Sequence, residues 1–454
     1  MINRVRYQLT EADIPQTWYN LAADLPDMAP PINPRTGQPI TREDMKRTMP
    51  DALIEQELSK EREFEIPEPV RQVYAQWRPT PMFRARRLEQ ALGTPARIYY
   101  KYEGDAPTGS FKPNSAIAQA YYNKEAGKTL LVADTGAGQW GSAVAFAAKL
   151  FDMSAKVYQV KVSYQQNPHR RALMETFGAT CVPSPSTETE AGRAILAENP
   201  DHPGSLGVAK SEALQTVFDN PEAAYTRGSA SNHVCAHQTV IGQEAIRQME
   251  LAEDYPDIVI GCSGGGSNLA GLSFPFLGAK LRGGRDLRIV AVEPVACPTL
   301  TRGRIAYDYA DSGGLTPLYR MHTLGHTFVP PPVHAGGLRA HGIAPLVSRA
   351  VEEGHIEAVA VTQTSCFEAG VQFLHAEGIL PAPESTHAVR VAIDEAIRCR
   401  EEGESRAILF GLTGHGYFNL SAYERYFAGT LPDDALSDDV LDHGLASIPE
   451  LALV

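Results

Sequence analysis

Apolar segments of two kinds alternate along most of the chain from Arg78 onward. Short runs rich in β-branched and aromatic residues have the length of buried strands, and longer segments between them have the apolar spacing of helices. The strand-like runs lie at 97–103, 129–135, 155–162, 257–263, 287–294 and 407–414, and the helix-like segments at 113–127, 142–152, 169–179 and 268–281. Such alternation favours parallel sheets with helical crossovers. Because the pattern stops near residues 200–235 and then returns, we expect two α/β domains that share a cleft.

The segments outside this pattern have a different composition. Residues 1–77 are rich in proline and charge, and they predict an arm that docks on the rest of the protein. Residues 298–345 predict a long irregular connection, which is uncommon unless the segment has a function. The acidic residues 431–454 predict a peripheral tail. We therefore expect an N-terminal domain at 78–230 and a C-terminal domain at 231–430.

Size, charge and cysteine content narrow the class of protein. The 454 residues exceed what one hydrophobic core usually serves, and 41 Lys and Arg against 54 Asp and Glu give a net charge of -13. This charge disfavours nucleic acid and anionic membranes as partners. Six scattered cysteines without a Cys-x-x-Cys pair predict reduced thiols. Because the first residues lack the apolar stretch of a secretory signal and no apolar run reaches about 18 residues, we expect a cytoplasmic protein.

A lysine stands where a loop becomes a helix in the run TGSFKPNSA, residues 108–116. Pro113 suits the first helical position, since it has no N–H to leave unpaired, and it biases the preceding residue away from helical dihedral angles. We therefore expect Lys112 to lie outside the helix with its amine directed into a cleft. Taken alone, the same lysine would be an ordinary exposed residue near a helix start.

Two glycine loops follow strand-like runs and precede helices. The first, GAGQWG at 136–141, fits G-x-G-x-x-G, but the next strand lacks the acidic residue that a dinucleotide ribose requires. Its backbone amides favour a substrate carboxylate. The second, GCSGGGSN at 261–268, lets the backbone approach a phosphate closely, and its lack of a Gly-Lys-Ser/Thr ending favours a single phosphate monoester. A plain tight turn is the alternative for each loop.

A third motif, LTGHG at 412–416, follows the last strand-like run. The neutral hydroxyl of Thr413 suits a position facing the ring nitrogen of a pyridine cofactor, where an aspartate would instead keep that nitrogen protonated. A neutral partner favours elimination and replacement at the β-carbon. Taken alone, Thr413 would be a strand-end capping residue. The nearby histidines have spacings that suit no metal site.

These motifs, in this order, resemble the fold type II pyridoxal 5'-phosphate (PLP) enzymes, and the stretch from about Arg78 to Tyr426 is similar to the tryptophan synthase beta chain family. The similarity is greatest to the second class of that family, which is longer at the N-terminus and is thought not to depend on the usual alpha subunit. Supporting runs are RPTPMFRARRLE, NHVCAHQTVIGQE, YDYADSGGLTPL, VPPPVHAGGLRAHGIAP and LPAPESTHAV. The resemblance implies two three-layer α/β domains with mostly parallel sheets and an active site in the cleft between them.

The resemblance also implies roles for the residues of these motifs. Lys112 would hold PLP as a Schiff base and move the α-proton, Asp134 would assist the leaving group, and Thr413 would meet the pyridine nitrogen. Further cofactor contacts would come from Asn114, Gly264, Gly265, Gly266, Ser267, Asn268, Glu384 and Gly414. The substrate carboxylate would be bound by Thr135, Gly136, Ala137, Gly138 and Gln139. Family members are homodimers and often bind a monovalent cation, K⁺ or Na⁺, through backbone carbonyls, so we expect no metal-binding side chains.

Three positions depart from the family pattern. Phe111 stands where the family has histidine, Pro113 where it has isoleucine or leucine, and Asp134 where it has glutamate. That glutamate is credited with protonating the leaving hydroxyl and activating indole, and a displacement of about 1 Å lowers a rate on the order of a hundredfold. The departures indicate either a different nucleophile or a slower synthesis of tryptophan.

The expected reaction is β-replacement, in which L-serine or O-phosphoserine combines with indole or a related nucleophile to give L-tryptophan or another β-substituted alanine. One alternative is a PLP lyase that acts by β-elimination on serine, threonine or their phosphate esters, because Phe111 is shared with the threonine synthase motif. Another is a catalytically silent paralogue that serves as a binding subunit. The expected partners are an amino acid, a small nucleophile and a second copy of the chain, without an alpha subunit.

Overall fold

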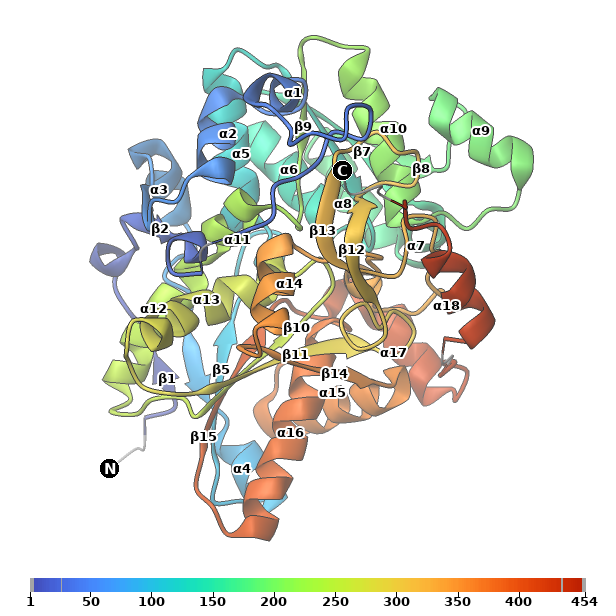
Figure 1. Ribbon diagram of the computed structural model, residues 1–454. Helices are drawn as coiled ribbons and strands as arrows, with labels where there is room; N and C mark the ends of the chain where they lie inside the picture. Colours follow the sequence, from blue (N-terminus) through green and yellow to red (C-terminus); the bar gives the residue numbers. More distant parts are fainter. Residues whose placement is uncertain (1–3, 26, 434–435, 451–454) are drawn as a thin grey trace.

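The computed structural model describes residues 4–25, 27–433 and 436–450. Most of its strands form two sheets, one of seven strands and one of four, and helices cover both (Figure 1). The expected α/β architecture with parallel sheets is confirmed, and the strand-like and helix-like segments lie where the apolar pattern predicts them. None of the helices described is long and apolar enough to span a bilayer.

The larger sheet contains the strands that precede and follow the glycine loop at 261–268. Its order is β1 (Arg6–Tyr7), β4 (Met82–Arg84), β5 (Arg97–Tyr102), β15 (Ala407–Leu412), β10 (Ile258–Cys262), β11 (Arg288–Pro294) and β14 (Glu357–Val361). The five strands from β5 to β14 are parallel, whereas at one edge β4 pairs antiparallel with β5, and β1 pairs antiparallel with β4. Parallel strands bring their carboxyl ends to one edge of the sheet, where open α/β sheets bind ligands.

The smaller sheet contains the strand that precedes the glycine loop at 136–141. Its order is β8 (Thr180–Ser184), β7 (Ser154–Val160), β6 (Leu130–Thr135) and β9 (Ala223–Thr226), and all four strands are parallel. Alternate side chains of β6 face opposite layers: Leu131 and Ala133 pack in the main core, and Val132 packs in a second core with Leu214. Each face of the sheet is therefore covered by helices, as a buried parallel sheet requires.

The helices form the outer layers of both sheets. On the larger sheet, α12 and α13 pack on one face, and α4, α15 and α16 pack on the other; on the smaller sheet, α6 and α10 pack on opposite faces. Their bounds are α1 (Arg42–Lys46), α2 (Asp51–Leu58), α3 (Glu68–Tyr74), α4 (Arg86–Leu92), α5 (Pro113–Glu125), α6 (Gln139–Leu150), α7 (Lys161–Gln166), α8 (Pro168–Thr176), α9 (Glu190–Glu198), α10 (Leu206–Phe218), α11 (Asn232–Gln238), α12 (Val240–Leu251), α13 (Ser267–Leu281), α14 (Pro345–Glu352), α15 (Gln363–Glu377), α16 (Ser385–Glu402), α17 (Leu420–Phe427) and α18 (Asp438–Leu445).

The strands divide between the sheets differently from the domain boundaries expected at residues 78 and 230. Strand β5 pairs with β15 along its whole length, from Arg97 to Tyr102, so the segment before Lys112 belongs to the larger sheet. The expected break at 200–235 instead holds α10 and β9, the fourth strand of the smaller sheet. Apolar runs report burial but not which sheet a strand joins, so the sequence alone does not distinguish these arrangements.

The connection expected to be irregular and the tail expected to be peripheral both contain regular structure. Within 298–345, β12 (Arg304–Tyr309) and β13 (Leu318–Thr323) form an antiparallel hairpin. In the tail, Leu441 and Leu445 of α18 are buried against the segment that follows the hairpin. The tail residues 434–435 and 451–454 lie outside the described part of the chain.

The N-terminal arm contributes β1 to the edge of the larger sheet, and its strands β2 (Thr17–Tyr19) and β3 (Glu63–Glu65) pair with each other. Farther along the arm, Gln56 and Glu57 of α2 contact histidines of α11: the Gln56 side chain lies 2.8 Å from His237, and the Glu57 carboxylate lies 2.5 Å from His233. Contacts of this kind join the arm to the core of the protein.

Candidate active site

Both glycine loops and the lysine that precedes α5 line one cavity. Its walls include Lys112, Asp134 and Glu384, and its empty volume is about 860 Å³ when the open mouth is included. The larger sheet supplies the 264–268 loop after β10 and Thr413 after β15, whereas the smaller sheet supplies Asp134 and the loop after β6. Residues about 150 positions apart in the chain therefore meet in one site.

Lys112 directs its amine into this cavity, but its backbone is not in the predicted conformation. Pro113 is the first residue of α5, as predicted, but the dihedral angles of Lys112, φ -57° and ψ -34°, are helical, so the prediction that Pro113 keeps Lys112 out of helical dihedral angles is wrong. The Lys112 carbonyl accepts hydrogen bonds from the amides of Ser115 and Ala116, and these bonds offset the unfavourable conformation before proline. The Lys112 amine donates a hydrogen bond to the carbonyl oxygen of Gly228 at 2.6 Å.

Burial lowers the proton affinity of the Lys112 amine. The low-polarity surroundings disfavour the charged form and lower the pKa of Lys112 from 10.5 to about 8. A neutral amine is both a nucleophile and a proton acceptor, so near neutral pH this residue is better suited to covalent and acid–base chemistry than an exposed lysine.

The 264–268 loop forms a nest of backbone amides at the N-terminus of α13. Among the described residues, no backbone or side-chain group accepts a hydrogen bond from the amides of these five residues. Gly266 has a φ of +92°, which favours glycine. A Cβ on Gly264 would lie 2.5 Å from the carbonyl oxygen of Gly337, so that position also excludes larger residues. Unpaired amides beside the positive end of a helix dipole suit a phosphate.

The 136–139 loop forms a second nest at the N-terminus of α6. Its amides have no hydrogen-bond acceptor in the part of the chain that is described, and Gly138 has a φ of +97°. A Cβ on Gly136 would lie 2.7 Å from the carbonyl oxygen of Gly336. The backbone of Gly336 and Gly337 therefore packs against both glycine loops. This arrangement suits a second, smaller anion such as a carboxylate.

Hydrogen bonds with neighbouring residues fix the side chains of Glu384 and Thr413 in the cavity wall. The Glu384 carboxylate accepts one hydrogen bond from the Gln139 side chain and another from the Gly337 amide, each at 2.9 Å, and it thereby links the smaller sheet to the larger. The Thr413 hydroxyl lies 2.8 Å from the hydroxyl of Ser385. Thr413 thus presents a neutral group to the cavity.

Asp134 is the last residue but one of β6 and is buried in the wall of the cavity. Burial raises the pKa of Asp134 above its ordinary value, although Lys210 and a hydrogen bond from the Tyr225 hydroxyl partly oppose this effect. Tyr225, on the neighbouring strand β9, holds the Oδ1 atom of the carboxyl. The side chain is one methylene shorter than the glutamate of the family pattern, and Tyr225 fixes its position.

The structure places most of the residues predicted for the site at the cavity. Three predicted residues do not line it: Asn114, Gly138 and Gly414. Gly138 packs against Arg170, and Gly414 pairs with Ser110 in an isolated bridge. The sequence reasoning also missed residues that do contact the site, namely Tyr225, Gly228, Lys210, Ser385 and the Gly336–Gly337 pair. Of these residues, only Gly336 and Gly337 stand out in the sequence, because they are paired glycines within the long connection at 298–345.

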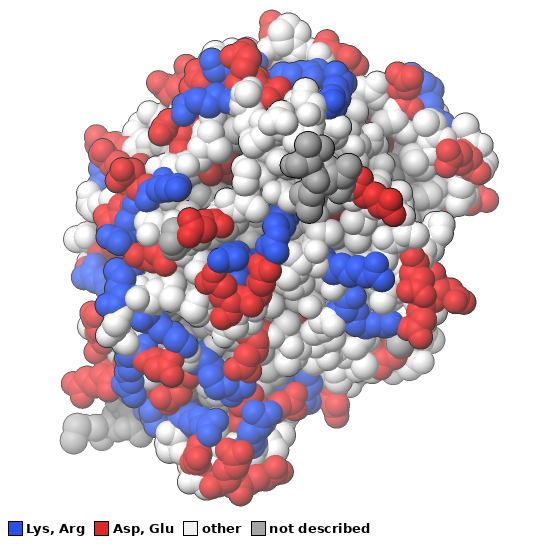
Figure 2. All heavy atoms as spheres, in the orientation of Figure 1, with Lys and Arg blue, Asp and Glu red and all other residues white. Residues whose placement is uncertain are grey.

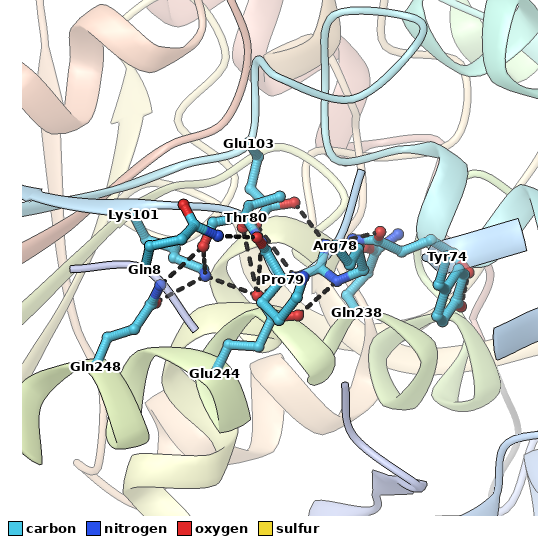
Figure 3. A network of polar contacts seen from close by, with 11 residues as sticks. Gln8, Tyr74, Arg78, Pro79, Thr80, Lys101, Glu103, Gln238, Glu244 and Gln248 are labelled. Atoms are coloured by element: carbon cyan, nitrogen blue, oxygen red, sulfur yellow. Dashed lines mark hydrogen bonds and ion pairs between the residues drawn. The ribbon is translucent and has the colours of Figure 1, made fainter. Parts of the chain in front are cut away.

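Asn114 instead contacts a buried ionic network. Figure 3 shows the charged members of this network, Arg78, Lys101, Glu103 and Glu244. The Asn114 side chain accepts a hydrogen bond from Arg78 at 2.9 Å, and Arg78 forms ion pairs with Glu103 at 3.0 Å and Glu244 at 2.8 Å. Lys101 donates to the same Glu244 at 2.7 Å. Although burial disfavours the guanidinium, the two carboxylates raise the pKa of Arg78. The network connects β5 and α12 to the first turn of α5, next to Lys112.

Breaking this network should destabilise the protein. We expect Glu244→Gln to lower the free energy of unfolding by about 3–5 kcal/mol, because it leaves buried cations without their partner. Urea unfolding followed by circular dichroism measures this change. The matched control is Glu55→Gln, which removes an exposed ion pair with Arg42 and should change stability by less than about 1 kcal/mol. A Glu244→Gln variant as stable as the control would contradict the prediction.

The residues around the cavity fit PLP. One nest of unpaired amides matches its phosphate, the Lys112 amine can hold its aldehyde carbon, and the neutral Thr413 suits its ring nitrogen. A second nest remains for the carboxylate of an amino acid. Together the fold and the cavity define a pyridoxal-phosphate dependent enzyme of fold type II.

Comparison with known proteins agrees with this class. Residues 73–414 match the family described as "Pyridoxal-phosphate dependent enzyme". The chain is 55% identical over 432 residues to "Tryptophan synthase beta chain 2" of Aquifex aeolicus, with 94% of this chain and 100% of that one covered. It is also 55% identical over 421 residues to "Tryptophan synthase beta chain 2" of Thermotoga maritima, covering 92% and 100%. The chain therefore belongs to the tryptophan synthase beta chain family, in its second class.

Solved structures with little sequence identity share the fold. The L-serine ammonia-lyase from Rhizomucor miehei aligns with a TM-score of 0.56 at 16% identity, covering 77% of this chain and 97% of that one. A threonine deaminase from T.th. aligns with a TM-score of 0.53 at 21% identity, covering 73% and 91%. These alignments support the fold type II architecture expected from the sequence.

Proposed function

We propose that this enzyme catalyses β-replacement, joining the three-carbon unit of L-serine or O-phosphoserine to indole or a related nucleophile to give L-tryptophan or another β-substituted alanine. One observation carries the proposal: the Lys112 amine and the Asp134 carboxyl line a single cavity together with two nests of unpaired amides. The two nests suit the two anionic groups, one on the cofactor and one on the amino acid.

When PLP is bound, its ring withdraws electrons from the α-carbon of the amino acid. The 264–268 loop binds the phosphate, and the 136–139 loop orients the substrate through its carboxylate. Lys112 holds the cofactor and removes the α-proton, a role that the lowered pKa of its amine favours. The neutral hydroxyl of Thr413 leaves the ring nitrogen unprotonated, which favours chemistry at the β-carbon.

Asp134 assists the group that leaves the β-carbon. Because burial raises the pKa of Asp134, the carboxyl keeps its proton to a higher pH and donates it to the departing oxygen. Tyr225 holds Oδ1, which leaves Oδ2 as the oxygen for this proton transfer. The same carboxylate then accepts the proton that the nucleophile loses.

The oligomeric state and cellular location that we propose are those expected from the family resemblance and the sequence. We propose a homodimer that acts in the cytoplasm without an alpha subunit. All six cysteines are free thiols, which supports a reducing compartment. Exposed Tyr417, Leu420 and Phe427, close together in the chain, support contact with a second copy. A bound K⁺ or Na⁺ belongs to the same proposal.

Mass spectrometry of the products tests the reaction. The purified holoenzyme is given L-serine or O-phosphoserine with indole and with a panel of carbon, nitrogen and sulfur nucleophiles. We expect a β-substituted alanine whose mass contains the nucleophile, and tryptophan when indole is present. Pyruvate and ammonia formed at the same rate with and without a nucleophile would establish the elimination lyase instead.

A further inference from the structure

The N-terminal arm contacts two segments that surround Lys112. Helix α2 of the arm packs against α5, which begins directly after Lys112, and against α11 (Figure 1). The chain enters α11 from the 228–231 segment, in which the Gly228 carbonyl accepts the hydrogen bond from the Lys112 amine at 2.6 Å. Gly228 and Ser229 of this segment also line the reaction cavity. The surroundings of the Lys112 amine therefore depend on elements that the arm touches.

Glu57, in the last turn of α2, caps the N-terminus of α11. Ser231 is the N-cap residue of α11, but its side chain makes no capping hydrogen bond. The Glu57 carboxylate instead accepts a hydrogen bond from the His233 amide at 3.0 Å, and the same oxygen lies 2.5 Å from Nδ1 of the His233 ring. Although burial opposes the charged form, His233 holds the pKa of Glu57 below its ordinary value. A carboxylate at the first turn of a helix satisfies a free amide and complements the helix dipole.

Gln56, the preceding residue, begins a chain of hydrogen bonds that reaches the same region. Burial lowers the pKa of His237 well below its ordinary value, so the ring is neutral, and one ring nitrogen donates while the other accepts. The Gln56 carbonyl oxygen lies 2.8 Å from Nε2 of His237, which is therefore the donor, and Nδ1 accepts from the Ser115 hydroxyl at 3.1 Å. Gln119 donates to the Ser115 hydroxyl at 2.9 Å and to the Arg227 carbonyl at 2.8 Å. The chain thus connects the arm, through the first turn of α5, to the backbone that leads into the 228–231 segment.

The two arm residues differ from the exposed side of their helix. Gln56 is buried and the Glu57 side chain is 16% exposed, whereas the Glu55 side chain is 64% exposed and forms a surface ion pair. Figure 2 shows charged atoms of both signs on the surface over α1 and α2. On the inner side of the arm, the Trp18 ring lies against the His237 ring, with the ring centres 4.4 Å apart. The inner side of the arm is therefore fitted to α11, and its outer side is an ordinary charged surface.

We propose that Glu57 and Gln56 are positioning residues for Lys112: docking of the N-terminal arm holds the 228–231 segment and the first turn of α5, and thereby the direction of the Lys112 amine. The inference rests on the proposed role of Lys112 in removing the α-proton. A base must lie within hydrogen-bond distance of the proton that it takes, and a displacement of about 1 Å lowers a rate on the order of a hundredfold. Neither connection passes through the 136–139 loop, which is proposed to bind the substrate carboxylate. Loss of a connection should therefore slow proton removal without weakening substrate binding.

Exchange of the α-hydrogen of L-alanine for deuterium tests the proposal. L-Alanine has no leaving group, so Lys112 takes the α-proton, exchanges it with solvent and returns a deuteron to the same carbon. NMR of the PLP-loaded enzyme in D₂O gives the maximal exchange rate per bound PLP and the half-saturating L-alanine concentration. We expect Glu57→Ala to lower the maximal rate about 10- to 100-fold and to change the half-saturating concentration by less than about threefold. Glu57→Gln keeps an oxygen that accepts from the His233 amide, so its rate should be within about fivefold of wild type.

Ser115→Ala tests the second connection independently, because it removes the hydroxyl between His237 and Gln119. Its maximal rate should fall about 3- to 10-fold, again with little change in the half-saturating concentration. Glu55→Gln is the matched control on the same helix; it loses only an exposed ion pair and should exchange at the wild-type rate. Visible absorbance of bound PLP and circular dichroism show that each variant is loaded and folded.

An arm with a merely structural role predicts a different result. In that case Glu57→Ala would lower the free energy of unfolding but leave the exchange rate per bound PLP unchanged, and this outcome would overturn the proposal. A higher half-saturating concentration at an unchanged maximal rate would also overturn it, since the arm would then act on substrate binding. Should Glu57→Ala fail to fold, Ser115→Ala decides, and a wild-type rate in that variant would overturn the proposal.

The exchange measurement also separates this inference from the proposed reaction. If Glu57→Ala exchanges the α-hydrogen slowly but the wild type forms no β-substituted alanine from any substrate, the reaction is wrong and the positioning role is supported. If the wild type forms the β-substituted alanine and Glu57→Ala exchanges as fast as the wild type, the reaction is supported and the positioning role is overturned.

Discussion

Lys112→Ala should abolish turnover and covalent retention of PLP together. We expect product formation to fall by about 10⁴-fold or more, because the variant loses both the group that holds the cofactor and the base that takes the α-proton. Borohydride reduction followed by peptide mapping should label Lys112 in the wild type and no residue in the variant. Lys149→Ala is the control and should behave as wild type. Labelling of another lysine in the wild type would contradict the assignment.

The pH dependence of cofactor uptake gives a second observation on the same amine. Because burial lowers the pKa of Lys112 to about 8, its neutral form becomes abundant above that pH rather than above 10.5. The rate at which ligand-free protein reacts with PLP should therefore rise with pH and level off above about 8. A rate that keeps rising towards pH 10.5 would show that the amine is solvated like an exposed lysine.

Asp134→Asn should slow product formation by about 10²- to 10⁴-fold without preventing PLP binding, since the amide keeps the shape but cannot transfer a proton. Burial raises the pKa of Asp134, so in the wild type the protonated form is lost as pH rises through that pKa, and the rate of leaving-group departure falls. The variant should lack this pH dependence. Stopped-flow absorbance and steady-state rates measure both effects.

Tyr225→Phe is the companion variant, because it keeps Asp134 but removes the hydrogen bond that fixes Oδ1. Its rate should lie between those of wild type and Asp134→Asn. If Asp134→Asn retained a rate within about threefold of wild type, the carboxyl would not be the proton donor, and another group at the cavity would have to serve.

The parts of the site that the sequence predicted correctly are those that depend on local order along the chain. A strand, a glycine-rich loop and a helix N-terminus are consecutive in sequence, so both amide nests were visible before the fold was known. Lys112 was found in the same way, from its place between a strand and a helix. Its backbone conformation was predicted wrongly, because the rule for residues before proline does not account for the hydrogen bonds that the Lys112 carbonyl receives.

The parts that the sequence missed depend on contacts between distant segments. Tyr225 reaches Asp134 because β9 pairs with β6, although the two residues are 91 positions apart. The family resemblance implied that Asn114 contacts the cofactor, but its position within the helix turns it towards Arg78. In the same way, the pairing of β5 with β15 makes the segment before Lys112 part of the larger sheet, which the local sequence does not reveal.

Gly336 and Gly337 lie between the two nests, and their carbonyl oxygens occupy the space that a side chain on Gly136 or Gly264 would need. A single short connection therefore acts as a spacer that sets the separation between the two nests, which in the proposed function is the separation between the cofactor's phosphate and the substrate's carboxylate. An insertion or a bulkier residue in that connection would alter both anion sites at once. Attempts to enlarge the range of accepted amino acids should therefore leave these two glycines intact and vary the wall formed by Asp134, Tyr225 and Lys210.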